Sequence, residues 1–253
     1  GDSREFFIMH MDVYQGRNAA NIGIDPAIIA LPTSQKAVMN AVIQLDVHTA
    51  TDGLRHISMD NRYMAPEPAI LLREKYNCES SGTCRVNRIG YNMKKGTKVD
   101  YPARGMSAMI YDKCQRVICG QWMDSKCVNF VSTLSDFGAG TVQRQVGSEK
   151  ITLPCPNVLM KYQQDMGSID RSDQMRMHGG GFSNRVHFKK WYKKVYLAVI
   201  DCMMVNSFLA WNYAEKNCPD ISICKLERYE FMEYIAQSLL DYRDPSRLVL
   251  GNC

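Results

Sequence analysis

Two aspartates three residues apart, Asp170 and Asp173, are the first candidates for chemistry in this chain. They follow Gly167 and Ser168, which favour a turn and a helix N-cap, so a helix is expected to begin here. On a helix this spacing places both carboxylates on one face, near the positive end of the helix dipole. Such a pair is typical either of a solvated surface or of half a divalent-metal site, because Mg²⁺ binds carboxylate oxygens.

A second carboxylate motif lies at Asp60. Residues 56–63 predict a short strand that ends in Asp60 and Asn61, followed by a helix at 69–76. A carboxylate at the carboxyl end of a strand is a common place for site chemistry in a sheet flanked by helices. A single aspartate there is also a common helix cap. The two motifs together therefore favour a metal site more than either does separately.

The segments around these motifs predict a mixed α/β fold with a β-rich central region. A strand is expected at 6–14, and a helix capped by Ser34 is expected at 35–45. Between residues 77 and 156, turns separate short β-prone runs, and the polar stretch 141–150 is interpreted as a loop. The β-prone runs are 107–111, 115–122 and 127–132, with a hairpin turn at 113–116.

A basic segment with interleaved aromatic residues runs from Arg185 to Lys194 and leads into a long apolar helix through Tyr213. Such a run is typical either of one solvated helix face or of a surface that contacts nucleic-acid phosphates without reading bases. The residues alone leave both interpretations open. The last predicted helix, 226–242, is amphipathic and carries no functional signal.

Composition is that of a globular protein with its own core, since 45% of the 253 residues are hydrophobic and 23% are charged. The net charge of +5 is compatible with a nucleic-acid partner but does not require one. The ten cysteines include no Cys-x-x-Cys pair, which argues against structural zinc. No signal peptide is visible, so reduced thiols in an intracellular compartment are expected, with a disulfide framework as the alternative.

No membrane segment is expected. The longest apolar run, 195–205, is shorter than the roughly 18 residues of a membrane helix and is interrupted by Asp201.

Taken together, the motifs resemble the transposase domain of piggyBac-type elements. The matching blocks occur in the order of that family and extend over nearly the whole chain. They are 13–17, 59–63, 82–88, 122–128, 131–133, 166–174, 191–192 and 206–207, with Tyr162 and Asp201. Any one block is weak, but their combination is specific.

The resemblance implies an RNase H-like core, a mixed sheet flanked by helices, that is interrupted by a β-rich insertion. The first part of the core would be residues 1–76 and the insertion 77–156. The helical second part would be 157–217, followed by a helical tail at 218–253.

The resemblance also implies DNA cleavage and strand transfer by three carboxylates that hold two Mg²⁺ or Mn²⁺ ions. Carried over by motif, the metal-binding carboxylates are Asp2, Asp60 and Asp170, and Asp173 is an additional catalytic acidic residue. Two such ions activate a water or a 3′-hydroxyl and stabilise the leaving oxygen in an in-line displacement.

DNA is the partner that the resemblance implies, as transposon ends and a TTAA target, and the nucleus is the implied location. Family members act as dimers, which leaves a homodimer open here. The basic residues expected to face DNA phosphates are Arg85, Arg88, Arg171, Arg176, Arg185, Lys189, Lys190, Lys193 and Lys194.

Some features depart from the family pattern. Ser168 stands where the family usually has a second glycine, and Gln163 replaces a common asparagine. The family's N-terminal region, the strand before Asp2 and its cysteine-rich zinc module are absent from this sequence, so a truncated copy is expected. Two functions stay open: a metal-dependent transposase, or a non-catalytic derivative that retains DNA or protein binding. A third reading, an intracellular globular protein whose acidic residues are helix caps, fits the combined motifs least well.

Overall fold

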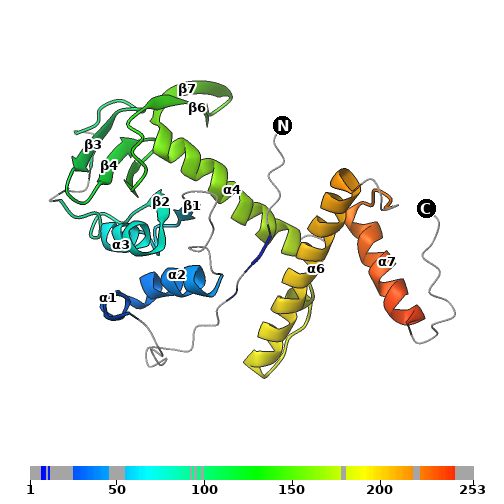
Figure 1. Cartoon of the computed structure of the whole chain (residues 1–253). Coiled ribbons are helices and arrows are strands. Elements are labelled where there is room, and N and C mark those ends of the chain that lie inside the picture. Colours follow the sequence, from blue (N-terminus) through cyan, green and yellow to red (C-terminus); the bar gives the residue numbers. More distant parts are fainter. Residues whose placement is uncertain are drawn as a thin grey trace. The chain divides into compact units, whose positions relative to one another are not determined.

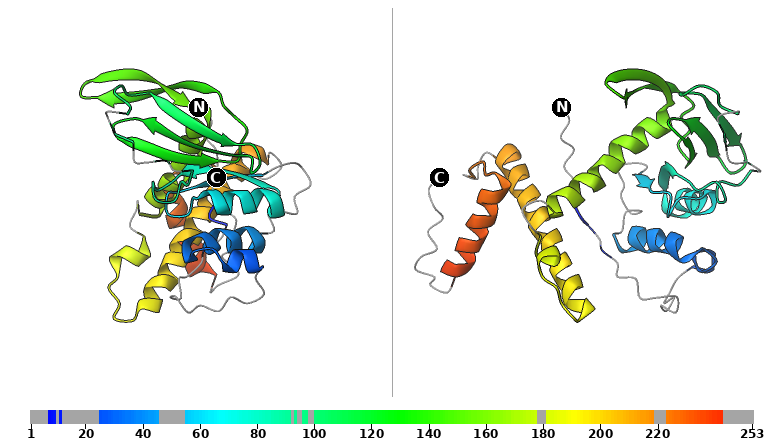
Figure 2. Two further views of the ribbon diagram at one scale, coloured as in Figure 1. Left: turned by 90° about the vertical axis from the view of Figure 1, so that its left-hand side faces the viewer. Right: turned by 180° about the vertical axis from the view of Figure 1, so that it is seen from behind.

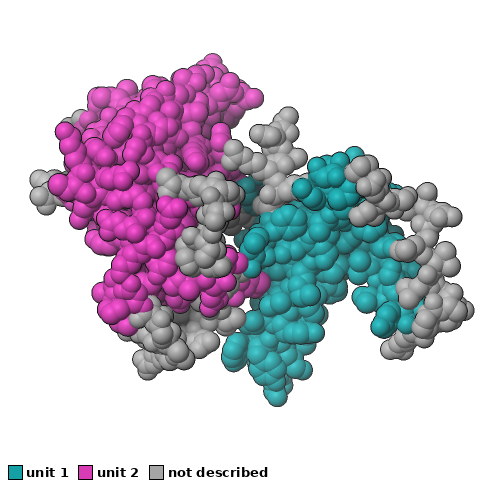
Figure 3. All heavy atoms as spheres, viewed as in Figure 1, with its two compact units in different colours: residues 1–9, 168–253 teal, residues 10–167 magenta. Residues whose placement is uncertain are grey.

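The computed structural model describes residues 7–9, 11, 25–45, 55–91, 93, 96–97, 100–177, 181–218 and 223–242. The chain divides into two compact units, which Figure 3 shows in different colours. One unit comprises residues 10–167, and the other comprises residues 1–9 together with 168–253.

The unit of residues 10–167 is built on a five-stranded mixed sheet with the strand order β1-β2-β5-β4-β3 (Figure 1). The first two strands are parallel and the remaining pairs are antiparallel. The strands are β1 Arg55–Met59, β2 Cys78–Thr83, β3 Ser107–Asp112, β4 Val117–Met123 and β5 Cys127–Ser132. All three short β-prone runs predicted between 107 and 132 are therefore strands, and residues 113–116 form the expected turn.

Helices cover both faces of this sheet. One face packs against α1 (Pro26–Ile29), α2 (Thr33–Gln44) and α3 (Pro66–Tyr76), in a core that includes Met39 and Leu72. The other face packs against α4 (Asn157–Met177) through Val158 and Leu159. α2 and α3 lie on the side of the sheet away from the hairpin of residues 139–156 in each view (Figures 1 and 2).

Strand alternation explains the two cores. On β4, Val117 and Cys119 belong to the core on the α3 side, whereas Ile118 and Trp122 belong to the core on the α4 side. Because successive side chains of a strand point to opposite faces, a strand covered on both sides is apolar throughout. Every residue of β4 is buried accordingly.

The stretch 141–150, expected to be a loop, is a hairpin instead. Strands β6 (Ala139–Val146) and β7 (Glu149–Pro156) pair along their length and turn at Gly147, whose φ of +61° suits glycine. The residues of β6 are mainly polar because most of them are exposed, and this polarity suggested a loop. Tertiary contacts hold the hairpin: the Trp122 indole donates to the Pro154 carbonyl at 2.8 Å.

The other unit contains the end of α4 followed by α5 (Phe182–Arg185), α6 (Trp191–Asn217) and α7 (Arg228–Asp241). The buried carboxylate of Asp201 accepts the backbone N–H groups of Phe182 and Ser183, at 2.7 and 3.0 Å. The α5 turn is thereby tied to the middle of α6. Rings of Phe208 and Trp211 pack against Phe231 of α7, with centroids 5.5 and 5.7 Å apart.

Two local predictions differ from the structure. α2 begins at Thr33 after Pro32 and has no side-chain cap, so the assignment of Ser34 as its cap is wrong. Phe7–Met9 and Met11 are described but are not in a strand, and the other residues of the expected strand 6–14 lie outside the described residues. Ile8 nevertheless has a partner of the kind that a strand would use, because the Asn206 amide exchanges two hydrogen bonds with its backbone, at 2.8 and 2.7 Å.

Eight of the described cysteines are free thiols, as expected, whereas Cys224 is disulfide-bonded and corrects that expectation at one position. By length and composition alone, α6 could cross a membrane, contrary to the sequence-based expectation, although a core helix of a soluble protein passes the same test. The prediction of a mixed α/β fold with a sheet flanked by helices is confirmed. The RNase H-like topology and the proposed domain boundaries stay predictions.

Candidate functional site

Asp60 lies directly after β1, at the carboxyl end of the parallel β1–β2 pair, as predicted. Its carbonyl accepts the N–H groups of Tyr63 and Met64, at 2.9 and 3.0 Å, so the chain turns sharply behind it. Its carboxylate accepts the N–H of Asn61, and the residue as a whole is half-buried. The carboxylate is therefore held at the edge of the sheet, where site chemistry is common in α/β folds.

The neighbouring strand leaves no room for a side chain at Gly82. A Cβ built on Gly82 would lie 2.0 Å from the carbonyl oxygen of Met59, the last residue of β1. The close approach of β2 to the residue before Asp60 thus requires glycine at this position. Gly82 belongs to one of the sequence blocks that carry the resemblance, and the structure supplies a physical reason for it.

Asp170 and Asp173 lie on α4, but not at its start. α4 is one continuous helix from Asn157 to Met177, so the prediction that a helix begins at Gly167 and Ser168 is wrong. The buried positions upstream extend the helix through the glycine, which costs only about 1 kcal/mol inside a helix. Asp170 and Asp173 therefore lie far from the N-terminal end of the helix, so the helix dipole does not favour their negative charge.

Both of these carboxylates are exposed. Asp173 forms an ion pair with Arg176 at 3.2 Å, three residues further along the helix, and its side chain is 68% exposed. Arg171 donates to the Ser168 hydroxyl at 3.3 Å. Asp170 and Asp173 share a helix face as their spacing predicted.

The structure does not bring the predicted three carboxylates into one cluster among the residues that it describes. Asp60 belongs to the unit of residues 10–167 and Asp170 to the other unit, and Asp2 lies outside the described residues. Within the described part of the chain, no three histidine, cysteine, aspartate or glutamate side chains form a metal-binding group. The metal site stays a prediction that rests on the sequence motifs and on the position of Asp60.

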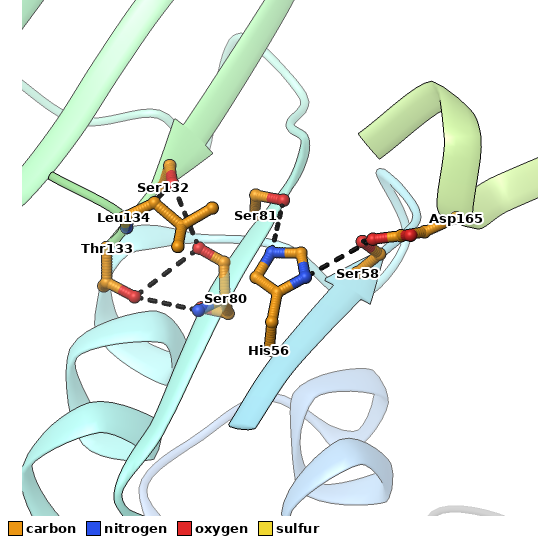
Figure 4. Close-up of polar contacts among 8 residues, drawn as sticks. All are labelled: His56, Ser58, Ser80, Ser81, Ser132, Thr133, Leu134 and Asp165. Atoms are coloured by element: carbon orange, nitrogen blue, oxygen red, sulfur yellow. Dashed lines mark hydrogen bonds and ion pairs between the residues drawn. The ribbon is translucent and has the colours of Figure 1, made fainter. Parts of the chain in front are cut away.

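A group of partly buried polar residues, which we call the His56 cluster, was missed by the sequence analysis. It consists of His56 and Ser58 on β1, Ser81 on β2 and Asp165 on α4, and Figure 4 shows the imidazole ring between Ser81 and Asp165. The Ser58 hydroxyl donates to Asp165 Oδ2 at 2.7 Å. His56 Nδ1 lies 3.3 Å from the same oxygen, and Nε2 lies 2.9 Å from Ser81 Oγ.

Burial lowers the pKa of His56 to about 4, and the positive charge of Lys161 acts in the same direction, whereas Asp165 opposes the shift. The imidazole is therefore neutral near pH 7. Because Asp165 accepts hydrogen bonds, Nδ1 carries the proton and Nε2 accepts the Ser81 hydroxyl. A signal for this cluster was present in the sequence, since His56, Ser58 and Asp60 alternate on one strand and so share a face.

The predicted DNA-contacting residues occur in both units. In residues 10–167, Arg85 is exposed, and Arg88 donates to the carbonyl of Arg62 at 2.7 Å, which holds Arg88 beside the turn that follows Asp60. In the other unit the basic segment 185–194 leads into α6, and all its residues are exposed. Its cations are Arg185, Lys189, Lys190, Lys193 and Lys194.

No acidic residue occurs in the sequence between Asp173 and Asp201, so nothing in that stretch offsets the charge of the basic segment. Two of its lysines lie over aromatic rings, Lys190 at 5.9 Å from the Tyr192 centroid and Lys193 at 5.5 Å from that of Phe188. The side chain of Trp191 is 71% exposed. Exposed cations beside aromatic rings can bind a nucleic acid, whose phosphates are negative and whose bases stack on rings. They are equally compatible with a face that contacts only solvent.

Comparison with known proteins points to the same family as the sequence motifs. A family model described as Transposase IS4 matches residues 2–208. The chain is also similar to a structure titled "Cryo-EM structure of piggyBac transposase synaptic complex with hairpin DNA", with a TM-score of 0.62 and 20% sequence identity. The similarity covers 95% of this chain but 45% of that chain, so this chain spans less than half of the length of that transposase. The resemblance drawn from the sequence is confirmed, and the chain belongs to the Transposase IS4 family and has the fold of a piggyBac transposase.

Proposed function

We propose that this chain is a DNA-processing domain of a transposase that cleaves and joins phosphodiester bonds with the help of divalent metal ions. The observation that carries the proposal is the position of Asp60 at the carboxyl end of the β1–β2 pair, in a chain of the transposase family. Transposases of this family generally use divalent metal ions. Asp60 is the carboxylate whose position within the fold best suits such a role.

The donor set fits hard cations. Asp60 and Asp170 offer short carboxylates with oxygen donors, which Mg²⁺ and Mn²⁺ prefer. Asp60 is held by its own turn, and Asp170 stands on a helix with Asp173 one turn further along. Two bound ions would supply activation of the attacking hydroxyl and charge stabilisation at phosphorus. Asp2 remains part of the proposal only as a sequence prediction.

The basic segment 185–194 would bind the DNA backbone. Its exposed cations have no acidic neighbour along the sequence, and phosphate contacts of this kind give affinity that falls steeply with salt. Arg85, Arg88, Arg171 and Arg176 would extend the contact, the last two from the helix that carries Asp170. The solved relative is, by its title, a synaptic complex with hairpin DNA, and this supports DNA as the partner.

Three finer expectations are part of the same proposal: transposon ends as the bound DNA, a TTAA target sequence and a nuclear location. A homodimer also stays a prediction. A chain that binds DNA but no divalent ion would instead be a non-catalytic derivative.

Metal binding by the intact chain tests the proposal. Calorimetric titration with Mn²⁺ would compare the unchanged chain with the double variant Asp60→Ala, Asp170→Ala, and with Glu149→Gln as a control at an exposed carboxylate of β7. We expect binding to the unchanged chain and the control, and loss of binding in the double variant. Equal binding by all three chains, or binding by none, would contradict a site built on Asp60 and Asp170.

A further inference from the structure

The two faces of β1 have different partners. Ile57 and Met59 pack into the core on the α3 side, whereas His56 and Ser58 point to the face on which α4 lies. Asp60 follows two residues after Ser58. The polar face of β1 therefore leads from the contact with α4 directly to the candidate metal ligand.

α4 reaches the sheet at two hydrogen-bonded points, one helical turn apart. The Tyr162 hydroxyl lies 3.1 Å from Thr83 Oγ1, at the carboxyl end of β2. Asp165 accepts from Ser58 near the carboxyl end of β1, at 2.7 Å. Both contacts come from the stretch of α4 just before the residues that carry Asp170. A slide of α4 by one turn, about 5.4 Å, would break both contacts.

The order of contacts Ser81–His56–Asp165 is that of a nucleophile, a base and a residue that orients the base. Ser81 is fully buried, at 0% exposure, so no substrate reaches its hydroxyl. The cluster therefore does not act as a hydrolytic triad. Its chemistry is that of a fixed connection: a neutral ring that donates on one side and accepts on the other.

We propose that Asp165 is a positioning residue for the metal site. By accepting from Ser58 and contacting His56, it holds α4 in one register against the end of β1. It thereby fixes the turn that presents Asp60. The inference rests on the proposed function, because it assigns Asp165 a role through the carboxylate of Asp60.

Three variants separate positioning from direct ligation and from general stability. Asp165→Ala removes the carboxylate that contacts both Ser58 and His56. Asp165→Asn keeps both contacts, since an amide oxygen at the position of Oδ2 accepts from the Ser58 hydroxyl and from His56 Nδ1–H, as that carboxylate oxygen does. Gln164→Ala is the matched control, because Gln164 is the exposed neighbour on the same helix.

Two measurements on the whole chain would read out the effect. Mn²⁺ affinity is expected to fall about 10-fold or more in Asp165→Ala, as is usual when a residue that supports the metal ligands is removed. Asp165→Asn should recover most of that affinity, and Gln164→Ala should match the unchanged chain. Amide hydrogen exchange at Tyr63 and Met64, whose N–H groups close the turn on Asp60, should accelerate in Asp165→Ala alone.

Each outcome decides a different question. Unchanged exchange at Tyr63 and Met64 in a folded Asp165→Ala chain would overturn the positioning role, whatever the metal does. Failure of Asp165→Asn to restore Mn²⁺ affinity would overturn it in favour of direct ligation, because a neutral amide is a poor ligand for Mn²⁺. If the unchanged chain binds no Mn²⁺ but shows the expected exchange pattern, the positional coupling stands and the proposed function fails.

Discussion

The His56 cluster and the basic segment 185–194 place polar side chains in opposite environments. In the cluster, side-chain exposure is 13% for His56 and 24% for Asp165, and hydrogen bonds connect three elements of the fold. In the basic segment every residue is exposed, and Lys190 and Lys193 lie over aromatic rings. The comparison teaches that polar residues of one chain can occupy two kinds of place, an internal contact between elements and an external charged surface. Substitutions should separate the two.

The largest expected effect comes from filling the space next to Asp60. Gly82→Ala would place a Cβ 2.0 Å from the Met59 carbonyl oxygen, so β1 must move away from β2. We expect a loss of about 3 kcal/mol or more in unfolding free energy, the upper range for overpacked sites, measured by urea unfolding. Gly147→Ala is the control, because nothing lies within 4 Å there and only its φ of +61° opposes a side chain. That strain should cost about 1 kcal/mol; equal losses for both variants would contradict the steric account.

Local sequence signals predicted those parts of the fold that local forces determine. The runs that became β3, β4 and β5 were identified because their turns and β-branched residues lie next to each other in the chain. The start of α4 was misplaced, because Gly167 and Ser168 favour a turn and a helix N-cap, whereas the buried contacts of Val158 and Leu159 begin the helix earlier. Tertiary packing overrides local propensity in such cases.

The candidate site was predicted as far as its motifs are local. Asp60 was placed at a strand end from neighbouring residues alone, and this is confirmed. The partner of Ser58 could not be predicted in the same way, since Asp165 is 107 residues away in the sequence. Nothing in the residues around Asp165 indicates which strand it contacts.

Acid should destabilise the buried region through His56. The pKa of the ring is about 4 in the folded chain against 6.5 ordinarily, so the unfolded chain takes up the proton first as the pH falls. The contribution of the neutral His56 ring to the unfolding free energy is complete above pH 6.5. It is lost as the pH falls from 6.5 to 4. The shift corresponds to about 3 kcal/mol.

Urea unfolding across this pH range would measure the effect, with His56→Gln as the variant that cannot titrate. The difference in pH dependence between the two chains isolates His56 from Lys161 and Asp165, which face the ring in both. If the two chains lose stability in parallel on acidification, the ring is not held neutral by the fold.

The basic segment should show the reverse behaviour, with a large effect on binding and little on stability. Lys189→Glu combined with Lys190→Glu is expected to weaken duplex DNA binding and to reduce the salt slope by about 0.9 for each phosphate that the variant no longer neutralises. The unfolding free energy should change by less than about 0.5 kcal/mol, as is usual for exposed positions. Fluorescence anisotropy over a salt series would measure both affinity and slope.

The control is Lys126→Glu with Lys150→Glu, which changes the net charge equally at two exposed lysines of the other unit. Affinity that depends on net charge alone would fall equally in both double variants. That result would identify the basic segment as a solvated helix face.

The smallest stability effect is expected at Asp173. Its side chain is charged and exposed, like those of the basic segment, but it belongs to the candidate site. Asp173→Asn removes an ion pair with Arg176 whose carboxylate is 68% exposed, and such pairs contribute at most about 0.5 kcal/mol. The carboxylate also stands close to the end of α4 at Met177, where the helix dipole disfavours negative charge, so the two effects oppose each other. A melting temperature equal to that of the unchanged chain is expected. Arg176→Gln breaks the same pair but keeps the carboxylate, so weaker Mn²⁺ binding in Asp173→Asn alone would assign Asp173 to the metal site, and equal binding in both variants would remove it.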